Sequence, residues 1–317
     1  MKTLRTGVVG VGHLGYHHAR NYAALPDAEL VGVVDTNPAN RERAAGDFTV
    51  PGFSDVEALI ACGVDAVSVA TPTSRHHDNV IALLQAGVDV LVEKPIAMTL
   101  LEAEAMVAVA KTHDCLLQVG HIERYNGAVM AFMRAIENPR FIECHRLSPF
   151  PGRGVDVSVV LDLMIHDLDI VLSMIDGEVI SLDAVGVPVL STQEDIANVR
   201  LRFDTGCVAN LTSSRVSMEK MRKIRIFESN AYLSTDYNAQ EVLVYRKSPG
   251  PIPEGGNPME HIKVEPLPVK RGEPLYLELA DFLESVRLRR KPQVSGEDGL
   301  RALRLAQDIT DFIRKQH

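Results

Sequence analysis

The turn after the first apolar run of the chain reads Gly10-Val11-Gly12-His13-Leu14-Gly15. Residues 6–9 before it are strand-like, and residues 13–25 after it carry a helical pattern that stops near a proline. A G-x-G-x-x-G turn between a strand and a helix is the context in which this pattern binds a dinucleotide. The glycines permit the tight turn, the close approach of a pyrophosphate, and close packing of helix on strand. We therefore predict a dinucleotide beside Gly10, Gly12, His13, Leu14 and Gly15, with its pyrophosphate at the helix N-terminus.

An acidic residue follows this turn at the distance that dinucleotide-binding folds use. Asp35 lies directly after the second apolar run, residues 29–34, and twenty positions after Gly15. A carboxylate there accepts hydrogen bonds from the adenosine ribose and repels a 2′-phosphate, so Asp35 favours NAD over NADP. Arg41 and Arg43 are close in sequence and keep NADP open as a second cofactor.

The order of strand and helix patterns predicts an α/β fold in two parts. Up to about residue 121, β-branched runs alternate with helical patterns, which is typical of a doubly wound parallel sheet covered on both faces. Beyond it, a long apolar helix over 157–175 is followed by consecutive strand-like runs over 179–245, which indicate a mostly antiparallel sheet. We predict a dinucleotide-binding Rossmann domain over 1–121 and an α+β domain for substrate binding and oligomerisation over 122–317.

Composition excludes several classes of function. The 317 residues carry a formal charge of -9, and the one compact basic run, residues 287–291, lies where a helix is predicted to end, so we expect no nucleic-acid partner. No stretch approaches the roughly 20 unbroken apolar residues of a membrane helix. Residues 1–5 show no signal-peptide core, so we expect a cytoplasmic protein that does not bind membranes. The four cysteines form no C-x-x-C pair, and we expect no metal site.

Three side chains are candidates for chemistry. Lys94 follows the apolar run 90–92, at the carboxyl end of a predicted parallel strand, where open α/β sheets bind ligands. Asp162 and His166 are four apart on the predicted helix and share one face. From the residues alone, a solvated lysine and a satisfied core histidine remain open beside the catalytic interpretation.

Four separated motifs together resemble the glucose-fructose oxidoreductase, inositol dehydrogenase and rhizopine catabolism protein family (Gfo/Idh/MocA). They are the glycine turn extended to His18, Ala70-Thr71-Pro72-Thr73-Ser74-Arg75-His76, Glu93-Lys94-Pro95, and Asp162-Leu163-Met164-Ile165-His166-Asp167. They stand in the family's order and spacing, so the resemblance covers nearly the whole chain. It implies a Rossmann domain followed by an α+β domain with a large open sheet, and oxidation or reduction of a hydroxyl of a sugar, cyclitol or sugar nucleotide.

The resemblance also implies roles for individual residues. Lys94 matches the family's catalytic lysine, and Asp162 and His166 match its substrate-binding and acid–base pair. Around the nicotinamide, the matching residues are Thr71, Pro72 and His76 beside the ribose and Glu93 near the ring. Whether Lys94 or His166 moves the proton stays open at this stage.

A further segment, Val119-Gly120-His121-Ile122-Glu123-Arg124-Tyr125-Asn126, is similar to members that oxidise the 3-hydroxyl of UDP-N-acetylglucosamine-type substrates. Arg124 and Asn126 are then candidates for contacts with a nucleotide-sugar phosphate or hydroxyl. A helix-start arginine and a helix N-cap asparagine are equally consistent with the two residues.

Two other functions compete with a sugar or nucleotide-sugar dehydrogenase. One is an enzyme of the same fold acting on a cyclitol, a dihydrodiol or a bilin. The other is a non-enzymatic NAD(P)-binding regulator, because fold alone does not fix function. In every case the second sheet offers a face for self-association, and we expect a homodimer or homotetramer.

Overall fold

The computed structural model describes residues 3–150, 157–237, 239–248, 250 and 257–316. Its contacts divide the chain into two compact units. The first comprises Met1–Ile122 and Glu273–Leu303, and the second comprises Glu123–Gly272 and Arg304–His317. Among the described residues, no helix is long and apolar enough to cross a membrane.

The first unit is built on a six-stranded sheet in the order β3-β2-β1-β4-β5-β6, and all of its strand pairs are parallel. Its strands are β1 (Leu4–Val9), β2 (Ala28–Val34), β3 (Gly52–Phe53), β4 (Ala66–Val69), β5 (Asp89–Glu93) and β6 (Leu117–Gly120). Every residue of β4, β5 and β6 is buried, as expected for strands covered on both faces. The predicted doubly wound parallel sheet is confirmed.

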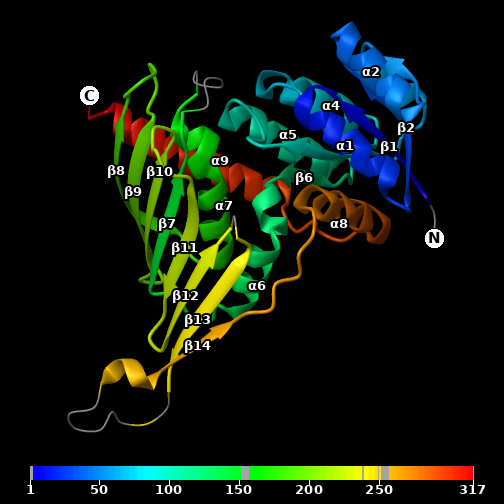
Figure 1. Ribbon diagram of the computed structural model, residues 1–317. Coiled ribbons are helices and arrows are strands. Elements are labelled where there is room, and N and C mark those ends of the chain that lie inside the picture. The colour runs from blue at the N-terminus through cyan, green and yellow to red at the C-terminus, as the bar shows by residue number, and fades with distance from the viewer. Residues whose placement is uncertain (1–2, 151–156, 238, 249, 251–256, 317) are drawn as a thin grey trace. The chain divides into compact units, whose positions relative to one another are not determined.

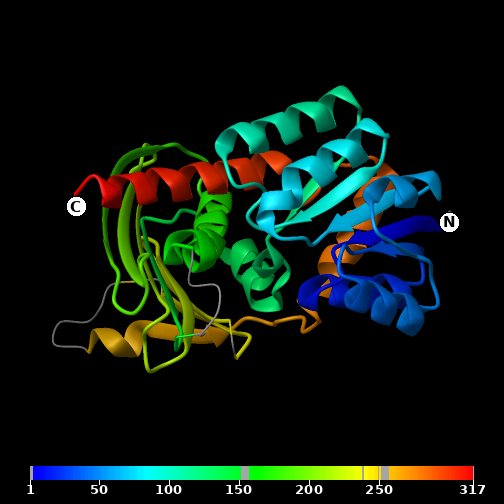
Figure 2. The same cartoon turned by 90° about the horizontal axis from the view of Figure 1, so that it is seen from above.

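Helices cover both faces of this sheet, as Figure 2 shows. The helices α4 (His76–Gln85) and α5 (Leu100–Thr112) pack together on one face, and α1 (His13–Ala24) packs with α2 (Pro38–Phe48) on the other. The short α3 (Val56–Ala61) follows β3. Capping side chains set several helix starts: Asn37 caps α2, Asp55 caps α3, and Thr99 forms a capping box with Glu102 at α5.

The helix α8 (Pro274–Leu288) belongs to the first unit, although it was predicted within a contiguous domain over 122–317. Its apolar face joins the core that α1 and β1 form. Leu279 and Phe282 are fully buried there with Val8 and Tyr22. The amphipathic pattern of α8 predicts a buried face but does not identify the sheet that it covers, which is why the second domain was predicted as one contiguous segment.

The second unit is built on an eight-stranded sheet in the order β14-β13-β12-β11-β7-β10-β9-β8. All neighbours pair antiparallel except β7 and β10, so the predicted mostly antiparallel sheet is confirmed. The strands are β7 (Phe141–Leu147), β8 (Val179–Val187), β9 (Ile196–Phe203), β10 (Val208–Ser214), β11 (Met221–Phe227), β12 (Ala231–Asp236), β13 (Glu241–Lys247) and β14 (Ile262–Pro266).

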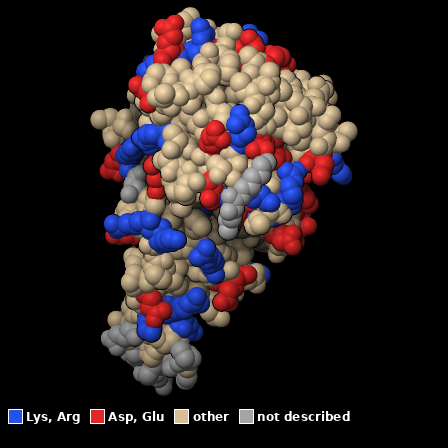
Figure 3. Space-filling view, turned by 90° about the vertical axis from the view of Figure 1, so that its right-hand side faces the viewer, with Lys and Arg blue, Asp and Glu red and all other residues tan. Residues whose placement is uncertain are grey.

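Helices α6 (Gly127–Ala135) and α7 (Ile165–Met174) lie on the same face of this sheet (Figure 1). Burial alternates along the strands that face them, most clearly in β9, because successive side chains point to opposite faces. The last helix, α9 (Gly296–Arg314), contributes residues to both units. On the face drawn in Figure 3, the visible cationic and anionic side chains of the described residues are interspersed.

Candidate functional site

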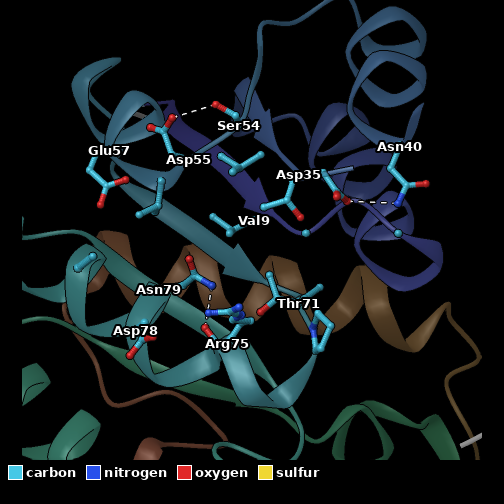
Figure 4. Close-up of a pocket in the computed structure, with 18 residues that line it drawn as sticks. Val9, Asp35, Asn40, Ser54, Asp55, Glu57, Thr71, Arg75, Asp78 and Asn79 are labelled. Atoms are coloured by element: carbon cyan, nitrogen blue, oxygen red, sulfur yellow. Dashed lines mark hydrogen bonds between the residues drawn. The ribbon is translucent and has the colours of Figure 1, made fainter. Parts of the chain in front are cut away.

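A cavity of about 720 Å³ in the first unit lies at the carboxyl ends of β1, β2 and β4. Ligands of open α/β sheets bind at this edge. Figure 4 shows Asp35 and Asn40 on one side of the cavity and Thr71 and Arg75 on the other. Its lining combines the glycine turn, the end of β2, and the segment that leads into α4: Val9, Gly10, Gly12, Val34, Asp35, Thr36, Asn40, Ser54, Asp55, Val56, Glu57, Ala70, Thr71, Pro72, Arg75, Asp78, Asn79 and Ala82.

The three glycines of the turn meet three different environments. Gly10 has a φ of +84°, and a Cβ there would lie 2.8 Å from the backbone nitrogen of Thr71. A Cβ on Gly15 would overlap the carbonyl oxygen of Gly10, because α1 packs directly on the turn. A Cβ on Gly12 would have nothing within 4 Å. The turn is therefore closed on the protein side and open at Gly12, which fits a pyrophosphate that approaches the backbone from the cavity.

The residues at the start of α1 are arranged to receive an anion. Gly12 occupies the N-cap position and supplies no capping side chain, and His13 and Leu14 are exposed. The first N–H groups of a helix lack intrahelical acceptors, and the helix dipole favours negative charge there. This geometry leaves room and free N–H groups for the pyrophosphate that the sequence predicts here, and its position remains a prediction.

The carboxylate of Asp35 is fixed by three donors at the end of β2. Its Oδ2 accepts from the N–H of Val11 at 3.0 Å and from Asn40 Nδ2 at 3.4 Å, and its Oδ1 accepts from the N–H of Asn37 at 2.8 Å. These bonds tie the glycine turn to the first turn of α2. Because Asp35 lines the cavity, it presents a fixed negative charge where an adenosine ribose would lie.

Arg41 and Arg43 were the reason to consider NADP as a second cofactor. Both side chains donate hydrogen bonds to backbone carbonyl oxygens. Arg41 Nη1 donates to the carbonyl of Asp35 at 2.8 Å, and Arg43 Nη2 donates to the carbonyl of Val11 at 3.2 Å. The Arg43 guanidinium also stacks 4.7 Å from the ring centre of Tyr16. Neither arginine lines the cavity, so no cation from α2 faces a 2′-phosphate among the described residues. The site fits NAD better than NADP.

Replacing Asp35 with alanine is expected to weaken NAD binding by roughly 10- to 150-fold, because hydrogen bonds to a charged group contribute about 1.5–3 kcal/mol. NADH fluorescence titration measures this effect. Glu42→Ala is the matched control, because Glu42 is an exposed carboxylate on α2 that does not line the cavity. An unchanged Kd for Asp35→Ala would remove Asp35 from the site.

Lys94 stands directly after β5. Its neighbours Glu93 and Pro95 each contact a buried histidine. Glu93 is buried, and its Oε2 accepts from the N–H of Lys94 at 3.3 Å. The Lys94–Pro95 peptide is cis. His18 of α1, the last residue of the first motif, contacts Glu93 Oε1 at 2.9 Å through Nε2, a role that its place in the sequence does not indicate.

His76, a predicted nicotinamide-ribose contact, is buried and contacts the turns that carry Thr71 and Pro95. Its Nδ1 lies 3.0 Å from the carbonyl oxygen of Pro95, and its Nε2 lies 2.9 Å from that of Thr71. Burial lowers the pKa of the imidazole, and the backbone hydrogen bonds oppose this effect. The geometry makes His76 a support of the Thr71 and Pro95 turns, whereas Thr71 and Pro72 line the cavity themselves.

In the second unit, Asp162 and His166 lie on either side of a change in helix type. A single α-helix was predicted over 157–175, but Val160–Met164 form a π-helical turn and α7 begins at Ile165. A spacing of four residues is slightly more than one turn of an α-helix and slightly less than one turn of a π-helix. Asp162 and His166 therefore lie more nearly in line than they would on a regular α-helix.

A buried ionic network holds the first turn of α7 through Asp167, the residue after His166. Arg146 Nε and Nη2 donate to the two oxygens of Asp167 at 2.9 and 2.8 Å, and Nη1 donates to Glu123 at 3.0 Å. Arg222 donates to the same Glu123 oxygen at 3.3 Å. Burial alone lowers the pKa of the Arg146 guanidinium, but the adjacent carboxylates of Asp167 and Glu123 outweigh it and raise this pKa. No local pattern in the sequence marks Arg146, because its partners are 21 and 23 positions away in the chain.

Arg146→Leu is expected to lower the free energy of unfolding by about 3–5 kcal/mol, because it leaves two buried carboxylates without their main partner. Chemical denaturation followed by circular dichroism measures this change. Arg225→Leu is the matched control: Arg225 pairs with Glu143 at 3.4 Å, both partly exposed, and such pairs contribute about 0–1 kcal/mol. Equal losses in the two variants would contradict a special role for the buried network.

The two predicted substrate contacts after β6 are both engaged within the second unit. Arg124 lies near Asp169, with Nη1 3.7 Å from Oδ1 and 3.5 Å from the carbonyl oxygen. Asn126 is buried and caps α6 by accepting from the N–H of Ala128 at 3.0 Å. The capping interpretation of Asn126 is therefore realised, and substrate contact by either residue remains a prediction.

Comparison with known proteins places the chain among dehydrogenases. Residues 4–121 match the model of an oxidoreductase family with an NAD-binding Rossmann fold, and residues 134–234 match the Gfo/Idh/MocA C-terminal domain. A UDP-N-acetylglucosamine 3-dehydrogenase from Acidithiobacillus ferrooxidans is 37% identical over 96% of both chains. A myo-inositol 2-dehydrogenase from Thermotoga maritima is 30% identical over 95% of this chain and 94% of its own length.

Solved structures agree with the sequence relatives. A structure of the Acidithiobacillus ferrooxidans enzyme aligns with a TM-score of 0.92 at 36% identity and covers 99% of both chains. The match therefore extends over both units and includes both domains that define the family. With a glycine turn open to a cavity, an acidic residue fixed at the end of β2, and sequence matches along the whole chain, the protein belongs to the Gfo/Idh/MocA family of oxidoreductases with an NAD-binding Rossmann fold.

Proposed function

We propose that this enzyme uses NAD⁺ to oxidise the 3-hydroxyl of a UDP-N-acetylhexosamine, with UDP-N-acetylglucosamine as the first candidate. The observation that carries the proposal is the full-length match to a UDP-N-acetylglucosamine 3-dehydrogenase, at 37% identity over 96% of both chains. Weaker support comes from the segment Val119–Asn126, which is similar to members acting on such substrates.

The proposed chemistry assigns roles to Lys94, Asp162 and His166. His166 takes the proton of the reacting hydroxyl as general base. Bound NAD⁺ would supply the acceptor for the hydride of the C–H bond. Lys94, as an ammonium, holds the reacting oxygen and stabilises the alkoxide charge that develops there. Asp162 orients His166 and stabilises its protonated form. The products are a ketone, NADH and a proton on His166.

The substrate is tested by incubating the purified enzyme with NAD⁺ and UDP-N-acetylglucosamine and following absorbance at the NADH band. We expect turnover and a product two hydrogen masses lighter than the substrate. Trapping the ketone with hydroxylamine before mass spectrometry locates the oxidised position. UDP-glucose, N-acetylglucosamine and myo-inositol are the comparison substrates, since they remove the acetamido group, the nucleotide, or both. Faster oxidation of myo-inositol than of any UDP-sugar would overturn the proposed substrate.

A cyclitol dehydrogenase is the second candidate, because a myo-inositol 2-dehydrogenase is 30% identical over 95% of this chain. The same assay separates the two functions by the order of kcat/KM. A protein that binds NADH but turns over none of these alcohols would fit the non-enzymatic regulator instead.

We also propose that the enzyme is a cytoplasmic homo-oligomer that associates through the sheet face opposite α6 and α7. An aromatic row crosses four strands on that face: Phe141, Phe227, Tyr232 and Tyr245, with successive ring centres 5.6, 4.8 and 4.9 Å apart. All four rings are partly exposed, and aromatic residues are enriched in protein interfaces. Sedimentation of the wild type against a Tyr232→Lys, Tyr245→Lys double variant tests this, and equal masses would exclude this face.

A further inference from the structure

Two buried histidines of the first unit flank the turn Glu93-Lys94-Pro95, and the proposed chemistry gives neither of them a role. His18 lies in α1 and His76 is the first residue of α4. Their relative exposures are 0% and 1%, so neither presents its ring to solvent. Buried imidazoles need polar partners, and each of these two rings has one on this turn: Glu93 for His18 and Pro95 for His76.

His18 fixes the side chain of Glu93 from the α1 side. Its Nε2 contacts Oε1 at 2.9 Å, while Oε2 accepts from the N–H of Lys94 at 3.3 Å. On the other side lies Gly120, the register partner of Glu93 in β6. A Cβ on Gly120 would lie 3.0 Å from the carboxyl carbon and from both oxygens. The carboxylate is therefore confined between an imidazole and a glycine, and it holds the Lys94 N–H in place.

His76 fixes the opposite side of the same turn. Its ring reaches the carbonyl oxygens of Pro95 and Thr71 at 3.0 and 2.9 Å. Both partners are acceptors, so one neutral tautomer donates to Pro95 and the other to Thr71, and only the protonated ring donates to both. In its Nδ1–H form the ring holds the carbonyl of Pro95, the residue that follows Lys94.

We propose that His18 and His76 are positioning residues for Lys94. His18 acts through Glu93 on the Lys94 N–H, and His76 acts directly on the Pro95 carbonyl, so the backbone is held at the lysine N–H and again at the carbonyl of the next residue. Fixed backbone on both sides restricts where the Lys94 ammonium reaches. This inference rests on the proposed role of Lys94 in holding the reacting oxygen, and a misplacement of about 1 Å is enough to slow catalysis on the order of 100-fold.

The test is a double-mutant cycle with Lys94. His18→Ala, His76→Ala and Glu93→Gln are each made in the wild-type enzyme and in a Lys94→Ala enzyme. We expect each to lower kcat by roughly 10- to 100-fold beside an intact Lys94, with KM nearly unchanged, and His18→Ala to leave the Kd of NADH nearly unchanged as well. In the Lys94→Ala enzyme the same substitutions should cost no further rate, because the group that they position is gone. Single-turnover measurements with excess enzyme keep the slow variants measurable. His113→Ala, which removes an exposed histidine of the same unit, is the matched control.

Losses that multiply in the Lys94→Ala enzyme would overturn the inference, since they would show a general structural role. A Lys94→Ala enzyme of normal rate would instead contradict the proposed function, so the two failures are distinguishable. If the alanine variants do not fold, Gly120→Ala replaces them in the cycle, because it crowds the Glu93 carboxylate without removing a buried group. It is expected to reproduce the loss in kcat and its disappearance beside Lys94→Ala, and additive losses would again overturn the inference.

Discussion

Lys94→Ala and His166→Ala should each slow alcohol oxidation severely while NADH still binds. A lost general base typically costs a factor of about 10² to 10⁴, and a lost donor to a developing oxyanion costs about 10² to 10³. Neither the glycine turn nor Asp35 is altered, so the Kd of NADH should stay within about twofold of the wild-type value. Steady-state kcat and NADH fluorescence titration measure the two quantities separately.

The controls for these variants lie in the same chain. Lys111→Ala and His113→Ala remove an exposed lysine and an exposed histidine at the end of α5, and both should retain full turnover. The Lys94→Ala, His166→Ala double variant should be slower than the wild type by less than the product of the two single-variant factors, because the effects of residues that act on one atom are not additive. Near-normal turnover of both single variants would refute the proposed catalytic roles.

Substituting alanine at the three glycines Gly12, Gly15 and Gly46 should give three qualitatively different outcomes. Gly15→Ala forces a methyl group onto the carbonyl of Gly10, and overpacking of this kind costs about 1–3 kcal/mol or more. Gly12→Ala meets only open space, so the apo protein should keep its unfolding midpoint while NAD affinity falls by at least about tenfold. Gly46→Ala, in the exposed part of α2, should stabilise by about 0.5–1 kcal/mol.

Thermal unfolding with and without NADH separates these three cases. Cofactor should raise the unfolding midpoint of the Gly46→Ala protein as it does that of the wild type, because a ligand bound to the native state stabilises it. The Gly12→Ala protein should show a smaller increase at the same NADH concentration, because its Kd is higher. A normal NADH-induced shift in that protein would place the pyrophosphate away from the turn.

The parallel sheet and the cofactor turn were predictable because both depend on local signals. Buried β-branched runs and the spacing from Gly15 to Asp35 are read directly from neighbouring residues. The placement of α8 was not predictable, since its apolar pattern shows that one face is buried but not which part of the chain buries it. The π-helical turn at Val160–Met164 was missed for a related reason, because apolar side chains all round a buried helix give no periodicity that distinguishes π from α.

The supports of the site were less accessible than its motifs. Glu93 and Lys94 belong to a recognisable motif, but the partner of Glu93 is His18, 75 positions earlier. Arg146 and Asp167 are separated by 21 positions, and only the pairing of β7 with its neighbours brings the arginine under α7. The one available signal was the concentration of carboxylates at Asp162, Asp167 and Asp169, which implies at least one buried cation nearby.

The position of α8 has a consequence for the order in which the chain is made. The six strands of the first sheet are complete by residue 120, but the helix that covers Val8 and Tyr22 is synthesised only at 274–288. At about 5–20 residues per second, a ribosome needs roughly ten to thirty seconds to extend the chain from residue 120 to residue 288. During this interval the nascent Rossmann sheet exposes an apolar flank that nothing downstream yet protects. We therefore expect a protein truncated at residue 122 to aggregate, because this apolar flank stays uncovered.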